Sequence, residues 1–89
     1  MISSKTELQS YVKETLSLFR RAASIAESKN KTLKIKAAKA VFIIFINRLE
    51  GVEKILSSGN GVDVHVMDVT FLKGIYDPVL QYWTEQLVD

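Results

Sequence analysis

The sequence predicts an all-α fold, a three-helix bundle. Three segments repeat apolar residues at helical spacing, polar breaks separate these segments, and only one short stretch alternates in the manner of a strand. The 89 residues are expected to form a single domain over 1–89. A domain of this size buries only about 60% of the surface of its unfolded chain, so its stability depends on close helix packing.

The first helix is predicted over residues 4–28. It begins with a capping box, in which Ser4 accepts a backbone hydrogen bond and Glu7 reaches back to the helix start. Apolar and small residues then recur at steps of three and four and define one face: Leu8, Val12, Thr15, Phe19, Ala22 and Ala26. Three further residues widen this face along one edge: Tyr11, Leu18 and Ile25.

The second helix is predicted over residues 32–57, from Thr32 to the break before Gly59. Its expected core stripe has the same spacing and consists of Ala38, Val41, Phe45, Leu49, Val52 and Leu56. Gly51 lies inside this helix, where glycine costs about 1 kcal/mol relative to alanine. It marks either a close crossing of two helices or a glycine that is merely tolerated.

Residues 58–67 are predicted to form an extended connector, because their valines alternate but no second strand is available for pairing. The third helix is expected over residues 68–88, with Asp68 as its N-cap. Its core stripe is Leu72, Tyr76, Val79, Trp83 and Leu87. Pro78 interrupts this pattern, so the helix is expected to be kinked or broken there.

The composition argues against several functions. The chain has no cysteine, and its N-terminus has no apolar signal segment, as in a cytoplasmic protein. The apolar run over 41–46 is far shorter than the roughly 20 residues of a membrane-spanning helix, so no membrane partner is expected. The lone histidine, His65, has no recognisable metal or nucleophile partners. We therefore expect a protein that is not an enzyme and has no cofactor or metal.

The stretch VFIIFI, residues 41–46, is too apolar to be covered by one bundle face. On a helical wheel Ile43 falls in the middle of the polar stripe, which contains Lys36, Lys39, Asn47, Glu50 and Lys54. Ile44 lies on the flank of that stripe, and Tyr82 departs from the core stripe that Trp83 continues. Ile43, Ile44 and Tyr82 are therefore the predicted partner contacts. The alternative is that they are isolated exposed side chains, which are common.

Charge is distributed unevenly along the chain. Residues 1–39 hold nine Lys/Arg and three Glu, whereas residues 40–89 hold three Lys/Arg and seven Asp/Glu. An antiparallel pair of helices gathers the cations at one end of the bundle, where phosphates can bind. The predicted nucleic-acid contacts are Arg20, Arg21, Lys31, Lys34, Lys36 and Lys39. The alternative is that the two halves of the chain attract each other within the fold.

The basic stretch LKIKAAKAVFIIFINRLE and the aromatic stretch VLQYWTEQLV give the chain a resemblance to a known type of protein. It resembles the small all-helical accessory subunits of family-B replicative DNA polymerases from Sulfolobus-type crenarchaea. The resemblance implies a subunit that binds a larger protein, a DNA polymerase, in DNA replication or another nucleic-acid process. Two alternatives remain: an autonomous nucleic-acid-binding protein that uses the basic end, and a homodimeric structural or regulatory module.

Overall fold

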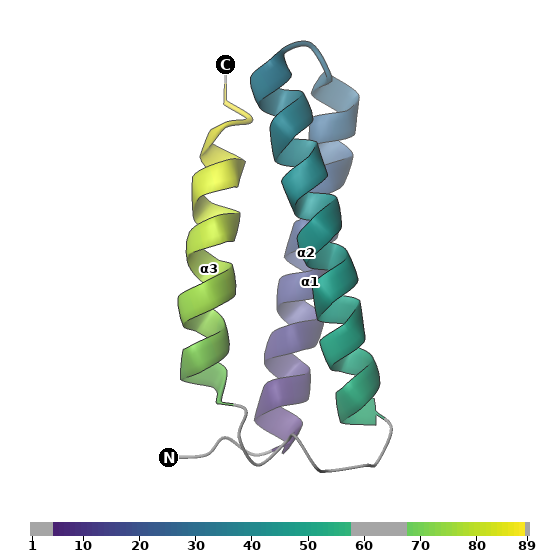
Figure 1. Ribbon diagram of the computed structural model, residues 1–89, viewed down its shortest axis with the longest axis vertical. Coiled ribbons are helices and arrows are strands. Elements are labelled where there is room, and N and C mark those ends of the chain that lie inside the picture. The colour runs from purple at the N-terminus through teal and green to yellow at the C-terminus, as the bar shows by residue number, and fades with distance from the viewer. Residues whose placement is uncertain (1–4, 58–67, 89) are drawn as a thin grey trace.

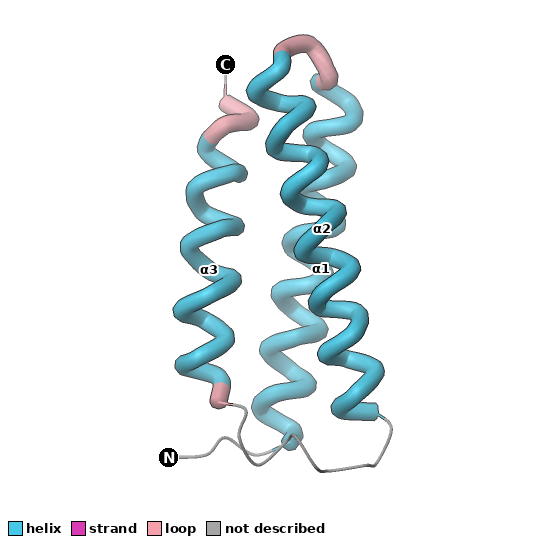
Figure 2. Tube along the Cα trace, in the orientation of Figure 1, coloured by secondary structure: helices cyan, strands magenta, loops and turns pink. Residues whose placement is uncertain are grey.

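The computed structural model describes residues 5–57 and 68–88, and in this part the chain forms three α-helices and no strand (Figure 1). These are α1 (Lys5–Lys29), α2 (Leu33–Ser57) and α3 (Val69–Glu85). They lie side by side with α2 antiparallel to the other two, and a short loop joins α1 to α2 (Figure 2). The predicted three-helix bundle is confirmed. Ser4 and the connector over 58–67, with its valines, Gly59 and His65, lie outside the described residues.

The predicted core face of α1 is confirmed, because all six of its residues are buried: Leu8, Val12, Thr15, Phe19, Ala22 and Ala26. Leu16, beside this face, is buried as well. The steps of four and three along α1 keep these side chains on one side of the helix. After the turn, the Thr32 hydroxyl accepts a 3.2 Å hydrogen bond from the Ile35 N–H, so α2 begins where the sequence predicts.

The core stripe of α2 differs from the prediction at its centre. Phe42 is fully buried and Val41 only half-buried, whereas the predicted stripe contained Val41 and not Phe42. Ile35 is also buried. The observed positions are 35, 38, 42, 45, 49, 52 and 56, which repeat steps of three and four as in α1. Both registers fit an unbroken apolar run, so spacing alone could not distinguish Phe42 from Val41.

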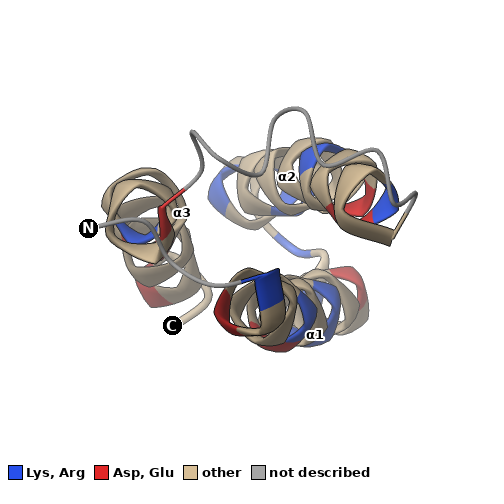
Figure 3. Cartoon of the chain, turned by 90° about the horizontal axis from the view of Figure 1, so that it is seen from below, with Lys and Arg blue, Asp and Glu red and all other residues tan. Residues whose placement is uncertain are grey.

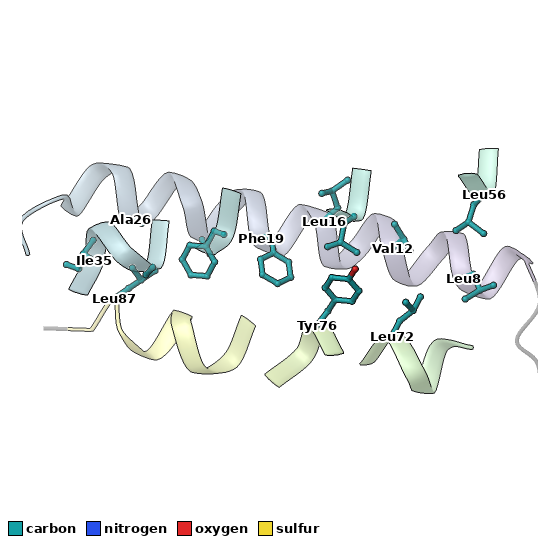
Figure 4. Close-up of a cluster of buried hydrophobic side chains, with 14 residues drawn as sticks. Leu8, Val12, Leu16, Phe19, Ala26, Ile35, Leu56, Leu72, Tyr76 and Leu87 are labelled. Atoms are coloured by element: carbon teal, nitrogen blue, oxygen red, sulfur yellow. The ribbon is translucent and has the colours of Figure 1, made fainter. Parts of the chain in front are cut away.

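Aromatic rings join the three helices at mid-height. Phe19 of α1 meets Phe42 edge-on at 6.1 Å between ring centroids and stacks on Phe45 at 5.9 Å. Phe45 in turn meets Tyr76 of α3 at 5.7 Å in a T-shaped pair. Both geometries are favourable for aromatic pairs. Figure 4 shows that the core continues in both directions, from Leu8 and Leu56 at one end to Ile35 and Leu87 at the other.

The start and the buried side of α3 follow the prediction. The Asp68 side chain accepts a 2.8 Å hydrogen bond from the Thr70 N–H, which confirms Asp68 as the N-cap. Within the predicted core stripe, Leu72, Tyr76 and Leu87 are buried, and Val79 and Trp83 are half-buried. The helix is continuous through Pro78, so the alternative of two separate helices is wrong. The kink stays a prediction.

The third helix makes fewer contacts with the bundle than the other two helices, since most contacts between helices join α1 to α2. Hydrogen bonds tie α3 and the residues after it to α1. The Tyr11 hydroxyl donates to Asp77 Oδ1 at 2.7 Å, and Lys29 Nζ donates to the Leu87 carbonyl at 2.9 Å. The second bond holds the end of the described chain beside the α1–α2 turn (Figure 1).

Candidate functional site

The three predicted partner contacts are all solvent-exposed. Ile43 is 43%, Ile44 50% and Tyr82 56% accessible. Consecutive residues of an α-helix are about 100° apart, so Ile43 and Ile44 point in different directions. The neighbours of each residue along α2 show where it faces.

Ile43 lies on the flank of α2 that faces α1. It is one turn from Lys39, whose ammonium pairs with Glu27 of α1. It is two turns from Glu50, which accepts from Arg20 of α1 at 2.8 Å. Residues at i±4 and i±7 share a helix face, so Ile43 stands beside these two interhelical ion pairs.

Ile44 lies on the opposite flank of α2, toward α3. One turn further on, the Arg48 guanidinium carbon stands 5.5 Å from the centre of the Phe45 ring. The same ring packs against Tyr76 of α3. The flank continues at helical spacing with Gly51 and Ile55.

The neighbouring flank of α3 is also apolar and exposed. It carries Phe71, Ile75 and Tyr82, at steps of four and seven. This flank lies away from Asp77, which faces α1 through its bond to Tyr11, and therefore lies toward α2. We define the two flanks together as the α2–α3 face, which consists of Ile44, Arg48, Gly51, Ile55, Phe71, Ile75 and Tyr82. Helix phase thus places Ile44 and Tyr82 on the α2–α3 face and Ile43 on the other flank of α2.

The six predicted nucleic-acid contacts do not form one uniform patch. Lys31, Lys34 and Lys36 are exposed near the α1–α2 turn, and within residues 5–57 and 68–88 no carboxylate pairs with them. Arg20 and Lys39 are instead engaged by Glu50 and Glu27, and Arg21 lies on the α3 side of α1. Figure 3 shows blue and red positions interspersed on α1 and α2. The basic end therefore consists mainly of three lysines.

A groove of about 1120 Å³ runs between α1 and α3. Leu18 and Ile25 line it and are 42% and 41% exposed, whereas Tyr11 is half-buried. The sequence placed these three residues at the edge of the core, and the i, i+7 spacing was the available signal. The spacing could not show that α3 leaves Leu18 and Ile25 open. We call this surface the α1–α3 groove.

Tyr11 and Asp77 join the two walls of this groove through their 2.7 Å hydrogen bond. Burial of the phenol and the hydrogen bond to Asp77 raise the pKa of Tyr11 above its ordinary value, while a hydrogen bond with Thr15 acts in the opposite direction. The phenol therefore stays protonated, and keeps donating to Asp77, well into the alkaline range.

This pKa shift makes a testable contribution to stability. Above about pH 10 a tyrosine of the unfolded chain loses its proton while Tyr11 of the folded chain keeps it, so the folded state is progressively disfavoured. We expect wild type to lose more stability than Tyr11→Phe between about pH 8 and about pH 11. Urea denaturation of both proteins at each pH measures this. A stability difference that does not change with pH would contradict the assignment.

Over residues 5–57 and 68–88, no three His, Cys, Asp or Glu side chains are grouped so as to hold a metal ion. Likewise, none of the described helices has the length and apolarity needed to cross a bilayer.

No family model matches the sequence, and comparisons with curated proteins and with solved structures gave no match.

Proposed function

We propose that this chain is a helical interaction subunit that binds a larger protein through the α2–α3 face. The observation that carries the proposal is the grouping of large apolar side chains on two adjacent helix flanks. These residues are between 39% and 64% exposed: Ile44, Ile55, Phe71, Ile75 and Tyr82. Single exposed apolar residues are ordinary, whereas a contiguous group of them is typical of a binding surface.

The side chains of this face are of the types that dominate binding energy. Aromatic residues and arginine are enriched in the centres of protein interfaces, and here Phe71, Tyr82 and Arg48 supply them. Two of these side chains are already held by neighbours. Tyr82 packs edge-on against Trp83 at 5.1 Å, and Arg48 rests over Phe45. Side chains that are ordered beforehand lose less conformational entropy on binding.

Gly51 supports the same surface. A Cβ atom built on Gly51 would meet nothing within 4 Å, so no described part of the chain packs closely there. A close crossing within the bundle is thus not the reason for this glycine. On the α2–α3 face it leaves the α2 backbone open between Ile44 and Ile55, where a partner can approach closely.

The partner that we expect belongs to a nucleic-acid-processing assembly. Lys31, Lys34 and Lys36 surround the α1–α2 turn, whereas the α2–α3 face lies further along α2 and on α3. The chain can therefore bind a protein and steer its basic end toward phosphates at the same time. The resemblance to polymerase accessory subunits makes a DNA polymerase the first partner to test.

The test is affinity capture from nuclease-treated lysate of the native host with four tagged baits: wild type, Ile44→Asp, Tyr82→Asp and Ile43→Asp. A carboxylate buried in an apolar contact is costly, so each face variant is expected to weaken binding by about 30-fold or more, equivalent to about 2 kcal/mol. Ile43→Asp, one residue away on the other flank, is the matched control and should capture the same protein as wild type. Circular dichroism and melting temperature should be unchanged in all variants, and titration with the purified captured protein gives the affinities.

Each of the other outcomes would indicate a different interface or a different function. Loss of capture with Ile43→Asp alone would move the interface to the flank of α2 beside α1. Capture that needs nucleic acid, falls steeply with salt and is lost with Lys34→Glu and Lys36→Glu would make the chain an autonomous nucleic-acid-binding protein. A dimer by light scattering that Ile44→Asp dissociates would identify the homodimeric module.

A further inference from the structure

The α1–α3 groove is long enough for a helix. Its lining extends from Thr6 to Ile25 along α1 and from Val69 along α3 to Val88, just past the end of that helix. At 1.5 Å per residue the α1 side is about 28 Å long, the length of a helix of about 18 residues. This surface is separate from the α2–α3 face, because it uses the other flank of α3.

The floor of the groove is apolar. Leu18 and Ile25 project from α1 two turns apart, and Ala22 lies between them. Leu80 of α3 and Val88, just past the end of that helix, line the opposite side. A row of apolar side chains between two helices accepts the apolar stripe of an amphipathic helix, whose anchors recur at i, i+3, i+4 and i+7.

The rim of the groove has the opposite charge to the chain. Four carboxylates line it, against two cations: Glu7, Glu14, Asp77 and Glu85, with Arg21 and Lys73. The whole chain carries a net charge of +2. Complementary potentials fix partner choice and orientation more than affinity, so this rim favours cations on the occupant.

We propose that the α1–α3 groove binds a cationic amphipathic helix of a partner protein. The apolar stripe of that helix covers Leu18, Ile25 and Leu80, and its lysines or arginines run alongside Glu14 and Glu85. The bound helix completes a four-helix bundle, in which α1 and α3 each gain a third packed neighbour. Proposals for the groove and for the α2–α3 face stand independently, because each can fail without the other.

The experiment is an NMR titration of the isotopically labelled full chain with two synthetic peptides. Both peptides are amphipathic helices of about 18 residues with the same leucine stripe; one carries lysines on its polar face and the other glutamates. We expect the lysine peptide to shift the amide signals of Leu18, Ile25 and Leu80. It should bind at least about tenfold more tightly than the glutamate peptide at low salt, and the preference should shrink as salt is added.

Two variants and a control locate the site. Glu14→Lys combined with Glu85→Lys is expected to abolish the preference for the lysine peptide, since it removes the acidic rim. Leu18→Gln should weaken binding of the lysine peptide about tenfold without changing the charge of the groove. Ile43→Gln is the matched control: Ile43 is 43% exposed and Leu18 42%, and Ile43 lies outside the groove, so peptide affinity should not change.

Several results would overturn the proposal. Equal affinity for the two peptides would show that the acidic rim does not select a cationic helix. If the peptide shifted only signals of the α2–α3 face, or no signals at all, the α1–α3 groove would not be a binding site for a helix. Concentration-dependent shifts without peptide, abolished by the double lysine variant, would make a second copy of this chain the occupant instead.

Discussion

Replacing Phe42 by alanine is expected to lower the free energy of unfolding by about 3–5 kcal/mol, the range for deleting a buried aromatic side chain. Phe42 is fully buried and makes the edge-on contact with Phe19 that joins α1 to α2. Domains of this size are stable by only about 5–10 kcal/mol. The variant should therefore lose much of its stability and melt far below wild type.

The measurement is urea denaturation followed by far-ultraviolet circular dichroism, with Val41→Ala and Ile43→Ala as neighbouring controls. Val41 is half-buried and Ile43 exposed, so both should cost clearly less than Phe42→Ala. If Val41→Ala were the most damaging of the three, the stripe predicted from the sequence would be right and the packing of α2 described above would be wrong.

Replacing Pro78 by alanine is expected to raise the free energy of unfolding, by as much as about 3 kcal/mol. Pro78 lies inside α3, where it has no N–H to donate to the Gly74 carbonyl. A proline ring inside a helix also crowds the carbonyl four residues earlier. Its side chain is exposed, so alanine restores the hydrogen bond with little loss of packing.

Thermal and urea denaturation measure this gain, and Pro78→Gly is the control. Glycine also restores the N–H but is about 1 kcal/mol worse than alanine in a helix interior, so its gain should be smaller by that amount. A loss of stability in Pro78→Ala would contradict the expectation. It would mean that Tyr76 and Val79 reach the core only because the proline bends α3 between them.

The parts of the fold that the sequence predicts well are those in which polar and apolar residues alternate clearly. The face of α1 is unambiguous because glutamates, lysines and serines separate its apolar steps. The stretch VFIIFI contains no such separators, so the burial of Phe42 is decided by the rotation of α2 against α1. That rotation depends on the whole interface between the two helices.

The candidate surfaces were predictable only in part, for a related reason. Exposure of Ile43, Ile44 and Tyr82 follows from their positions on a helical wheel. Their grouping does not, because it depends on which flank of α2 receives α3. The path of α3 likewise decides whether Leu18 and Ile25 are covered. The ion pairs of Arg20 and Lys39 depend on distances between α1 and α2, which cannot be read from spacing along the sequence.

Because α3 makes few contacts with α1 and α2, binding at one proposed surface is expected to affect binding at the other. Each surface uses one flank of α3, and the contacts that hold α3 to the α1–α2 pair are few. An element held this way opens at lower free energy than the rest of the fold. An occupant of either surface holds α3 in place, so a second occupant no longer bears the entropy of ordering it. The two sites should therefore bind their partners with positive cooperativity, although neither occupant touches the other.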